Sequence, residues 1–309
     1  MIKIFSILIT LLLVFNACSE KKQNHQASIS KKDTSNITKP LPELPKQMYF
    51  AGKKVILKDW DIQERLDREV LTNTYLQSAT SQIIKRANRW FPIIETILKK
   101  EGIHPDFKYL AVIESALIEQ AISPVGAEGF WQFMSYTAED FNLTINDEID
   151  ERLDVVKSTK AAAAYLNNAN DTLKDWLLAA ASYNRGIGGV LRDMKWQKAK
   201  SYFDMEQNHE TGRYVYRILA MKIIMENPTA YGFNIPKKQC YPAIKTRKYI
   251  IKKTIENLSD WAISKGANFK ILRKLNPWLR TTKLTIKNKS YTLLLPLNTE
   301  NIRPYSSYN

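Results

Sequence analysis

Apolar residues recur three and four positions apart along most of residues 60–230, and this spacing constrains the fold more than any other feature of the sequence. It is the spacing of one face of an α-helix. The pattern is clearest in four segments, residues 61–71, 81–91, 155–168 and 173–183. Pro92 and Pro105 stand where they would end the early helices. Because residues 60–230 show no alternating strand pattern and no internal repeat, they predict an all-α domain.

Glu114 lies inside this pattern, in the apolar run of residues 109–117. Folding that helix against a core would remove water from the carboxyl group, which disfavours the charged form and raises the pKa. A glutamic acid that stays protonated near neutral pH can serve as the general acid that cleaves a glycosidic bond. The alternative is an ordinary glutamate near a helix end, partly exposed and paired with a lysine.

Residues 123–134 follow this run and read as a tight loop. Ser123 and Pro124 form a turn signal, and Ser123 would cap that turn or contact a ligand. Gly126 and Gly129 indicate a backbone that turns sharply or lets another group approach closely.

Aromatic and amide side chains complete the candidate site. Trp131 and Phe133 would offer flat apolar faces for a sugar ring, and Gln132 can both donate and accept hydrogen bonds. Farther along, Tyr183 and Asn184 place a phenol and an amide at the end of another apolar helix. Each of these blocks is weak by itself.

Together, and in this order, the blocks closely resemble the lytic transglycosylase family of peptidoglycan-cleaving enzymes. The family pattern is a Glu-Ser pair, a Ser-x-x-Gly-Ala-x-Gly-Leu-x-Gln-x-Met block and an Ala-x-Tyr-Asn block, matched here by residues 114–115, 123–134 and 181–184. Phe130 replaces the usual leucine, and Ser182 replaces the commoner alanine. The resemblance covers about residues 90–233.

Two further blocks, residues 152–159 and 210–215, resemble the membrane-bound D-type branch of that family. The resemblance implies a goose-lysozyme-like, all-α catalytic domain. It also implies that Glu114 is catalytic and that six residues bind the substrate: Ser123, Gln132, Met134, Tyr183, Asn184 and Glu210. For Glu210 the alternative is a carboxylate favoured by the helix dipole in a first turn. Tyr214 is expected in the core.

The implied reaction cleaves the β-1,4 bond between N-acetylmuramic acid and N-acetylglucosamine and leaves a 1,6-anhydromuramyl end. Most glycosidases need two carboxylates, but neither Glu119 nor Glu128 reads as a fixed second one. The resemblance implies that Glu114 gives and then takes a proton, while the muramyl 6-hydroxyl attacks its own anomeric carbon. Two alternatives remain, a peptidoglycan hydrolase of the muramidase kind and a non-catalytic wall-binding lipoprotein.

The composition changes after Pro228. Residues 249–278 read as a strand, a short helix, a glycine turn and a second helix, and residues 291–296 read as a closing strand. This order resembles a degenerate LysM module, a small α+β fold that binds N-acetylglucosamine polymers. Lys253 and Thr254 stand where that module usually has Gly-Asp. The overall expectation is a mainly α chain, with a lysozyme-like domain followed by this module.

The N-terminal residues read as an export signal. A basic start and an apolar run too short to span a bilayer lead to Cys18, which resembles the lipidated cysteine of a lipoprotein; the alternative is a plain signal peptide with an incidental cysteine. A polar tether poor in large apolar residues follows. The expected segments are a signal at 1–18, a tether at 19–46, a catalytic domain at 47–235 and a LysM-like module at 245–300. The expected location is the cell envelope, with the lipid anchor in the outer membrane facing the periplasm.

Charge and cysteine content limit the remaining possibilities. The formal net charge is +15; we expect an anionic envelope polymer rather than nucleic acid as the partner, and solvated lysines are the alternative. Cys18 and Cys240 are the only cysteines, so an acylated Cys18 leaves no disulfide. The three histidines are far apart in sequence, and no metal or cofactor is predicted.

Overall fold

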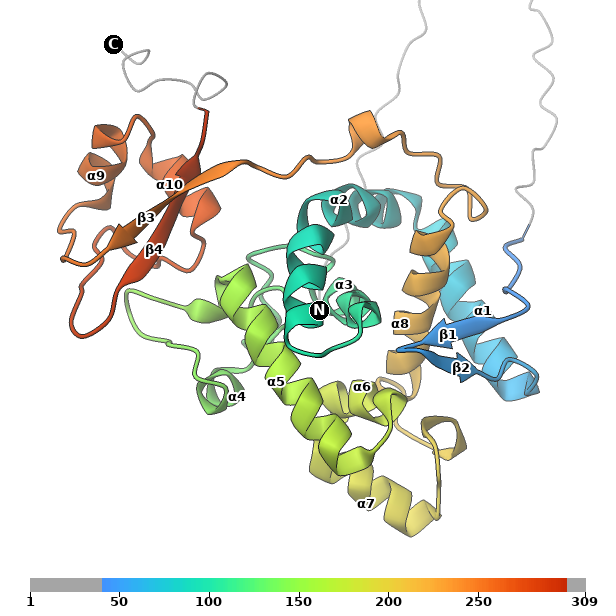
Figure 1. Cartoon of the computed structure of the whole chain (residues 1–309). Coiled ribbons are helices and arrows are strands. Elements are labelled where there is room, and N and C mark those ends of the chain that lie inside the picture. The colour runs from blue at the N-terminus through green and yellow to red at the C-terminus, as the bar shows by residue number, and fades with distance from the viewer. Residues whose placement is uncertain (1–40, 299–309) are drawn as a thin grey trace, which may run out of the picture. The chain divides into compact units, whose positions relative to one another are not determined.

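The structure, a computed structural model, describes residues 41–298 and is mainly helical (Figure 1). The predictions for the signal at 1–18, for Cys18 and for most of the tether lie outside the described residues. The elements run in the order β1 (Met48–Phe50), β2 (Lys53–Val55), α1 (Trp60–Tyr75), α2 (Gln77–Lys100), α3 (Lys108–Ser115), α4 (Ser135–Asp140), α5 (Val155–Leu173), α6 (Trp176–Arg185), α7 (Ile187–Gln197), α8 (Thr211–Glu226), β3 (Thr246–Ile251), α9 (Leu258–Ser264), α10 (Phe269–Leu275) and β4 (Tyr291–Pro296). Within residues 41–298 no helix has the length and apolar character needed to cross a bilayer.

Helices α1, α2, α5 and α6 occupy the segments where the apolar spacing predicts them. Asp59, Asp154 and Asp175 precede three of these helices, and each side chain accepts hydrogen bonds from two backbone N–H groups of the first turn. The prediction that Pro92 ends a helix is wrong, because α2 continues through it to Lys100. Apolar residues on both sides of the proline, among them Ala87 and Ile94, are buried on one stripe, and that packing outweighs the lost hydrogen bond.

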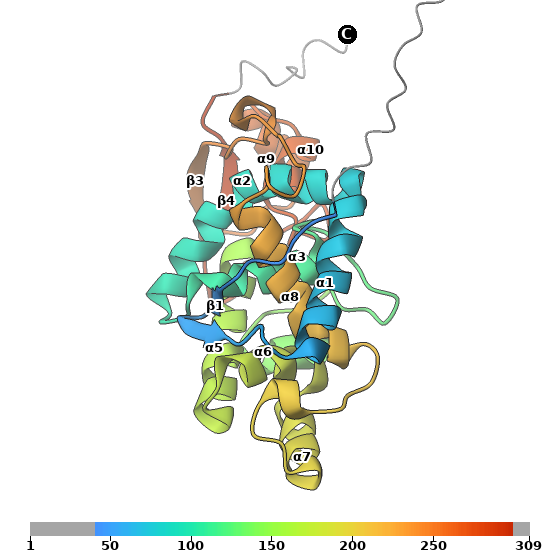
Figure 2. The same cartoon turned by 90° about the vertical axis from the view of Figure 1, so that its right-hand side faces the viewer.

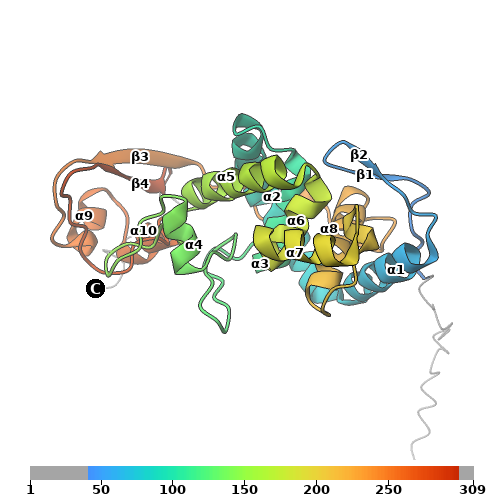
Figure 3. The same ribbon diagram turned by 90° about the horizontal axis from the view of Figure 1, so that it is seen from below.

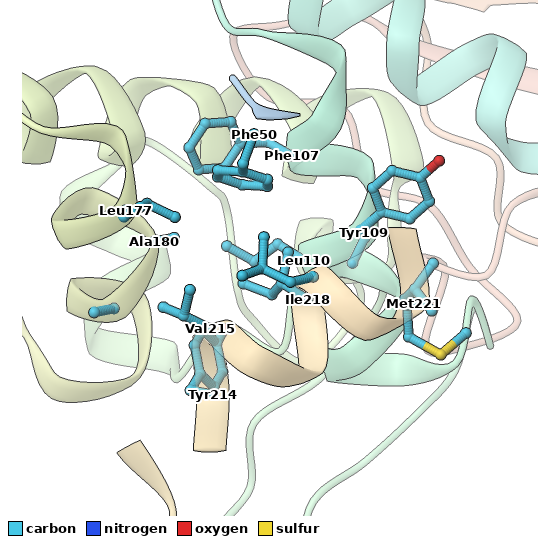
Figure 4. Packing of buried hydrophobic residues seen from close by; sticks show 14 of the residues in the cluster. Phe50, Phe107, Tyr109, Leu110, Leu177, Ala180, Tyr214, Val215, Ile218 and Met221 are labelled. Carbon is cyan, nitrogen blue, oxygen red and sulfur yellow. The ribbon is translucent and has the colours of Figure 1, made fainter. Parts of the chain in front are cut away.

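Helix α8 forms the centre of the helical domain and contacts α1, α3 and α6 (Figure 2). Most of its residues are buried, so it is apolar almost all round rather than on one stripe. Val215 and Ile218 of α8 pack near Leu110 of α3 and the rings of Phe50 and Phe107 (Figure 4). This packing fixes α3 and α8 side by side, and these two helices supply the site described below.

The short hairpin β1–β2 departs from the predicted all-α domain. Its turn is Ala51–Gly52, and both residues have positive φ, at 49° and 78°. The backbone N–H of Ala51 donates to the Asp106 carboxylate at 2.9 Å, which holds the turn against the domain. Strands of three residues are too short to show alternation, and Ala-Gly is not one of the usual hairpin dipeptides, so the sequence pattern did not reveal them.

The C-terminal module has the predicted β-α-α-β order. Strands β3 and β4 pair antiparallel, with Lys248 opposite Leu294, and α9 and α10 pack on one side of the pair (Figure 3). Asn276, which is fully buried, donates to the carbonyls of Leu272 and Leu294 and accepts from the N–H of Leu294. This amide therefore ties the end of α10 to β4.

Candidate active site

Glu114 is the penultimate residue of α3. Two arginine side chains donate hydrogen bonds to backbone carbonyls at this end of the helix. The helix stops because Ala116 and Leu117 both adopt positive φ, at 51° and 58°. Arg86 donates to the carbonyl of Ala116 at 2.8 Å, and Arg217 donates to the carbonyl of Ile113 at 3.3 Å. These bonds satisfy carbonyls that a helix end leaves without partners.

Glu114 lines a pocket of about 350 Å³. The lining residues come from α1, α2, α3, α8 and the loop after α3, and include Asn73, Ile83, Ser123, Gln132 and Arg217. Glu114 is the only carboxylate among the described residues that line this pocket. The predicted acid therefore faces a cavity rather than bulk solvent.

Desolvation raises the pKa of Glu114 from 4.5 to about 7. A hydrogen bond from the Tyr214 hydroxyl to Oε1 of Glu114 and the charge of Arg217 both lower this pKa, and the charge of Glu210 raises it. Burial is the largest effect, so near neutral pH the group is divided between acid and carboxylate. Because Oε1 accepts from Tyr214, the acidic proton belongs on Oε2.

Two tyrosines beside Glu114 stay protonated. Burial and the nearby Glu114 charge raise the pKa values of both Tyr183 and Tyr214 well above 10. The Tyr183 hydroxyl donates to the carbonyl of Trp131 at 2.9 Å, so it braces the loop rather than the acid. The resemblance implies that Tyr183 binds the substrate, by orienting Glu114 or the N-acetyl group of the sugar; in the structure the hydrogen bond to Glu114 comes from Tyr214 instead. Tyr214 is 3 % exposed, so its expected place in the core is confirmed.

The loop of residues 121–134, here called the catalytic loop, folds around two glycines as predicted. Gly126 and Gly129 have φ values of +85° and +82°. A Cβ on Gly129 would lie 2.2 Å from the carbonyl oxygen of Arg152, whereas a Cβ on Gly126 would meet nothing within 4 Å. Gly129 is therefore required twice, for its backbone conformation and for the close approach of residue 152.

Substituting Gly129 by Ala is expected to lower the free energy of unfolding by about 2–4 kcal/mol, since it combines left-handed strain with a backbone clash. Gly126→Ala is the matched control and should cost about 1 kcal/mol, since only the strain applies. Urea unfolding of the two variants measures the difference. Equal destabilisation by both would show that the Arg152 contact adds nothing.

Trp131 and Phe133 do not offer faces for a sugar, contrary to the sequence-based expectation. Their exposed fractions are 0 % and 3 %. The Trp131 indole N–H donates to the Thr159 hydroxyl at 2.9 Å, and the ring of Phe133 lies 6.0 Å from that of Tyr183. Alternating aromatic residues in a loop looked like a binding platform, but they anchor the loop in the core.

The structure brings Ser123 and Gln132 to the same pocket as Glu114 and leaves Met134 outside its lining. The Ser123 hydroxyl accepts from the N–H of Ala127 at 2.9 Å, which is the turn-capping role. Gln132 donates from its side chain to the carbonyls of Ala121 and Gly129. Met134 immediately precedes α4. Both pocket residues thus stabilise the loop that presents them.

Asn184 and Glu210 form a pair at the start of α8. Asn184 donates to the Glu210 carboxylate at 3.1 Å and accepts from the Thr211 hydroxyl at 2.7 Å. Glu210 precedes the first residue of α8 and is exposed. Neither residue lines the pocket, but the negative charge of Glu210 raises the pKa of Glu114.

Two residues of the site were missed by sequence reasoning, Tyr214 and Arg217. Both lie on α8, where the apolar pattern made Tyr214 look like an ordinary core residue. The available signal was their spacing from Glu210, because residues four and seven positions along a helix share a face. No group of three or more histidine, cysteine or acidic side chains within residues 41–298 could hold a metal ion.

The helical domain thus presents one desolvated glutamic acid in a pocket. Residues 91–205 match the model of the transglycosylase SLT domain, and residues 247–299 match that of the soluble lytic transglycosylase C-terminal LysM-like domain. The chain therefore contains a transglycosylase SLT domain, followed in sequence by a LysM-like domain.

The curated relatives include the membrane-bound lytic murein transglycosylase D of Escherichia coli K12, which is 26% identical over 247 residues, 78% of this chain and 53% of that protein. The chain thus spans about half the length of this relative. An Alteromonas protein named for tributyltin chloride resistance is 31% identical over 132 residues, 42% of this chain and 64% of that protein. A crystal structure of inactive lytic transglycosylase Slt from Pseudomonas aeruginosa covers 49% of this chain and 26% of its own, at 22% identity and a TM-score of 0.37.

Proposed function

We propose that this protein is a peptidoglycan lytic transglycosylase that cleaves the bond between N-acetylmuramic acid and N-acetylglucosamine. The observation that carries the proposal is Glu114, the one carboxylate lining the described pocket, with its pKa raised to about 7. The family match and the relative named for murein transglycosylase activity agree with this chemistry.

In the proposed reaction Glu114 acts twice. First its proton passes to the glycosidic oxygen, so the bond to the muramyl anomeric carbon breaks and N-acetylglucosamine leaves with a free hydroxyl. The muramyl N-acetyl group stabilises the positive charge at that carbon. The Glu114 carboxylate then takes the proton of the muramyl 6-hydroxyl, whose oxygen bonds to the anomeric carbon. No water is consumed, and Glu114 is left protonated again.

A single carboxylate favours this reaction over hydrolysis. An inverting or retaining hydrolase needs a second carboxylate across the bond. Glu119 and Glu128 are the two glutamates that follow Glu114 most closely in sequence, and each is already in an ion pair. Glu119 pairs with Lys274, and the Glu128 carboxylate is 2.9 Å from the Arg152 guanidinium. An intramolecular hydroxyl needs less activation than water because it is already held beside the carbon it attacks.

Ser123, Gln132, Met134, Tyr183, Asn184 and Glu210 are proposed to bind or shape the glycan site around Glu114. The proposed location is the periplasmic face of the outer membrane, with Cys18 acylated. The lipoprotein-like sequence at Cys18 and the membrane-bound relative support this location. The proposed partners are peptidoglycan strands and the membrane.

Digested peptidoglycan provides the direct test of the reaction. We expect mass spectrometry to find disaccharide fragments with 1,6-anhydromuramyl ends, each one water lighter than the hydrolysed fragment. A matched digest with a muramidase gives the hydrolysed masses for comparison. Hydrolysed ends alone would make this protein a muramidase, and an absence of new ends would make it a wall-binding protein.

A further inference from the structure

A buried arginine holds both arms of the catalytic loop. Arg152, 4 % exposed, donates to the carbonyls of Gly126 and Phe133 at 3.0 Å and 3.1 Å. It also donates to the carboxylates of Glu128 at 2.9 Å and Asp150 at 2.7 Å. The loop conformation therefore depends on the position and charge balance of this guanidinium.

The fourth charge of this cluster comes from the C-terminal module. Arg280, which lies between α10 and β4, is 3.1 Å from Asp150 and 3.6 Å from Glu128. Asp150 has no exposed surface. With Arg280 the cluster has two guanidinium groups and two carboxylates, and without it Arg152 alone would face both carboxylates, which leaves one negative charge unbalanced. An uncompensated charge in such a place is strongly unfavourable.

Backbone pairing fixes Arg280 in place. Its N–H donates to the carbonyl of Glu148 at 2.8 Å, and the N–H of Asp150 donates to the carbonyl of Trp278 at 2.8 Å. Ile149, between these contacts, forms an antiparallel bridge with Leu279 and belongs to the hydrophobic core of the module. Residues 148–150 are therefore shared between the helical domain and the module.

A second link reaches the catalytic loop at its beginning. Lys274 of α10 forms an ion pair with Glu119, two residues before the loop starts. The Glu119 side chain is only 13% exposed. Two residues after Glu119, the carbonyl of Ala121 accepts a hydrogen bond from the Gln132 side chain at 3.0 Å. The module thus contacts the supports of the loop at two separated points.

We propose that the C-terminal module positions the catalytic loop, in addition to any contact it makes with the wall. Arg280 is the positioning residue: through Asp150, Glu128 and Arg152 it holds Ser123 and Gln132 in the pocket of Glu114. Arg280 does not line that pocket, so it acts only through the cluster. The kinetic part of this proposal rests on the proposed function.

The test uses the full chain and a soluble, uncrosslinked peptidoglycan fragment of four sugars, which is too small to need wall binding. Arg280→Met should lower kcat for anhydro-product formation by about 10–100-fold, because small displacements of a site cost rates of this size. Arg280→Lys should retain part of the rate. Adding Glu128→Gln to Arg280→Met should recover part of it as well, because one carboxylate then balances Arg152.

Lys283→Met is the matched control. Lys283 lies in the same module and pairs with the exposed carboxylate of Glu256, without touching the cluster. This control should keep the kcat of the unmodified protein. Assays well below the midpoint of thermal unfolding of each variant separate positioning from loss of folded protein. An unchanged kcat for Arg280→Met, or a loss on intact sacculi alone, would overturn the proposal.

Hydrogen exchange supplies a readout that needs no enzymatic activity. Amide protection in residues 121–134 should fall in Arg280→Met and stay unchanged in Lys283→Met. If the unmodified protein forms no anhydro product, the proposed reaction is refuted, yet the exchange result still decides whether the module holds the loop. Equal protection in both variants would refute the positioning role whatever the reaction is.

Discussion

Glu114→Gln is expected to reduce anhydro-product formation by about 10³–10⁴-fold. The amide can neither give a proton to the glycosidic oxygen nor take one from the 6-hydroxyl, and acid–base assistance contributes roughly this much to rates. The substitution keeps the side-chain shape and an oxygen that can accept from Tyr214. The measurement is the initial rate on purified sacculi, followed by mass spectrometry of the released ends.

Glu139→Gln provides the control for this loss. Glu139 lies on α4, is exposed and makes no side-chain bond or ion pair within the described part of the chain. Its substitution should leave the rate unchanged. If Glu114→Gln still lysed sacculi at more than a tenth of the normal rate, another group would have to be the general acid.

The stability of Glu114→Gln shows whether the loss is chemical. Burial raises the pKa of Glu114 to about 7 from 4.5, so the folded state binds this proton more tightly than the unfolded chain does. The protein with Glu114 therefore loses stability as the pH rises from about 4.5 to about 7. Glutamine does not titrate. At pH 8 the variant should be more stable by on the order of 2–3 kcal/mol, and near pH 4 the difference should vanish.

The sequence predicted those parts of the site that depend on local pattern. Glu114 was found because a carboxylate in an apolar helix must lose water when the helix packs. The tight turns at Gly126 and Gly129 were predicted because glycine adopts positive φ more readily than other residues do. The module was recognised from the order of its elements, which the structure repeats from β3 to β4.

The rest depends on contacts between segments that are distant in sequence. Tyr214 reaches Glu114 only because α3 and α8 pack together, and nothing local to residue 214 indicates this. Trp131 and Phe133 were expected to offer flat apolar faces to a sugar, yet both are buried. Hydrogen bonds with Thr159 and Arg152 hold this part of the loop against the core. The cluster that includes Arg280 joins residues 152 positions apart, from Glu128 to Arg280.

Tyr214→Phe should lower kcat by about 10–100-fold and also move the alkaline limb of the pH–rate profile. Glu114 must start the reaction protonated, so the rate should fall as the pH rises through its pKa of about 7. The hydrogen bond from Tyr214 lowers this pKa. Without it the pKa rises, and the alkaline limb should move to higher pH although the maximal rate falls, because the carboxyl is no longer held in one orientation.

Two other tyrosines separate these effects. Tyr183→Phe removes a hydrogen bond to the Trp131 carbonyl rather than to Glu114, so it should lower the rate without moving the alkaline limb. Tyr231→Phe removes a similar bond, 2.9 Å long, to the carbonyl of Glu43 and should change neither. The measurement is kcat/KM from pH 5 to 9 on the soluble fragment. An alkaline limb at the same pH in Tyr214→Phe and the unmodified protein would mean that the group titrating there is not Glu114, because only that carboxyl accepts the Tyr214 hydrogen bond.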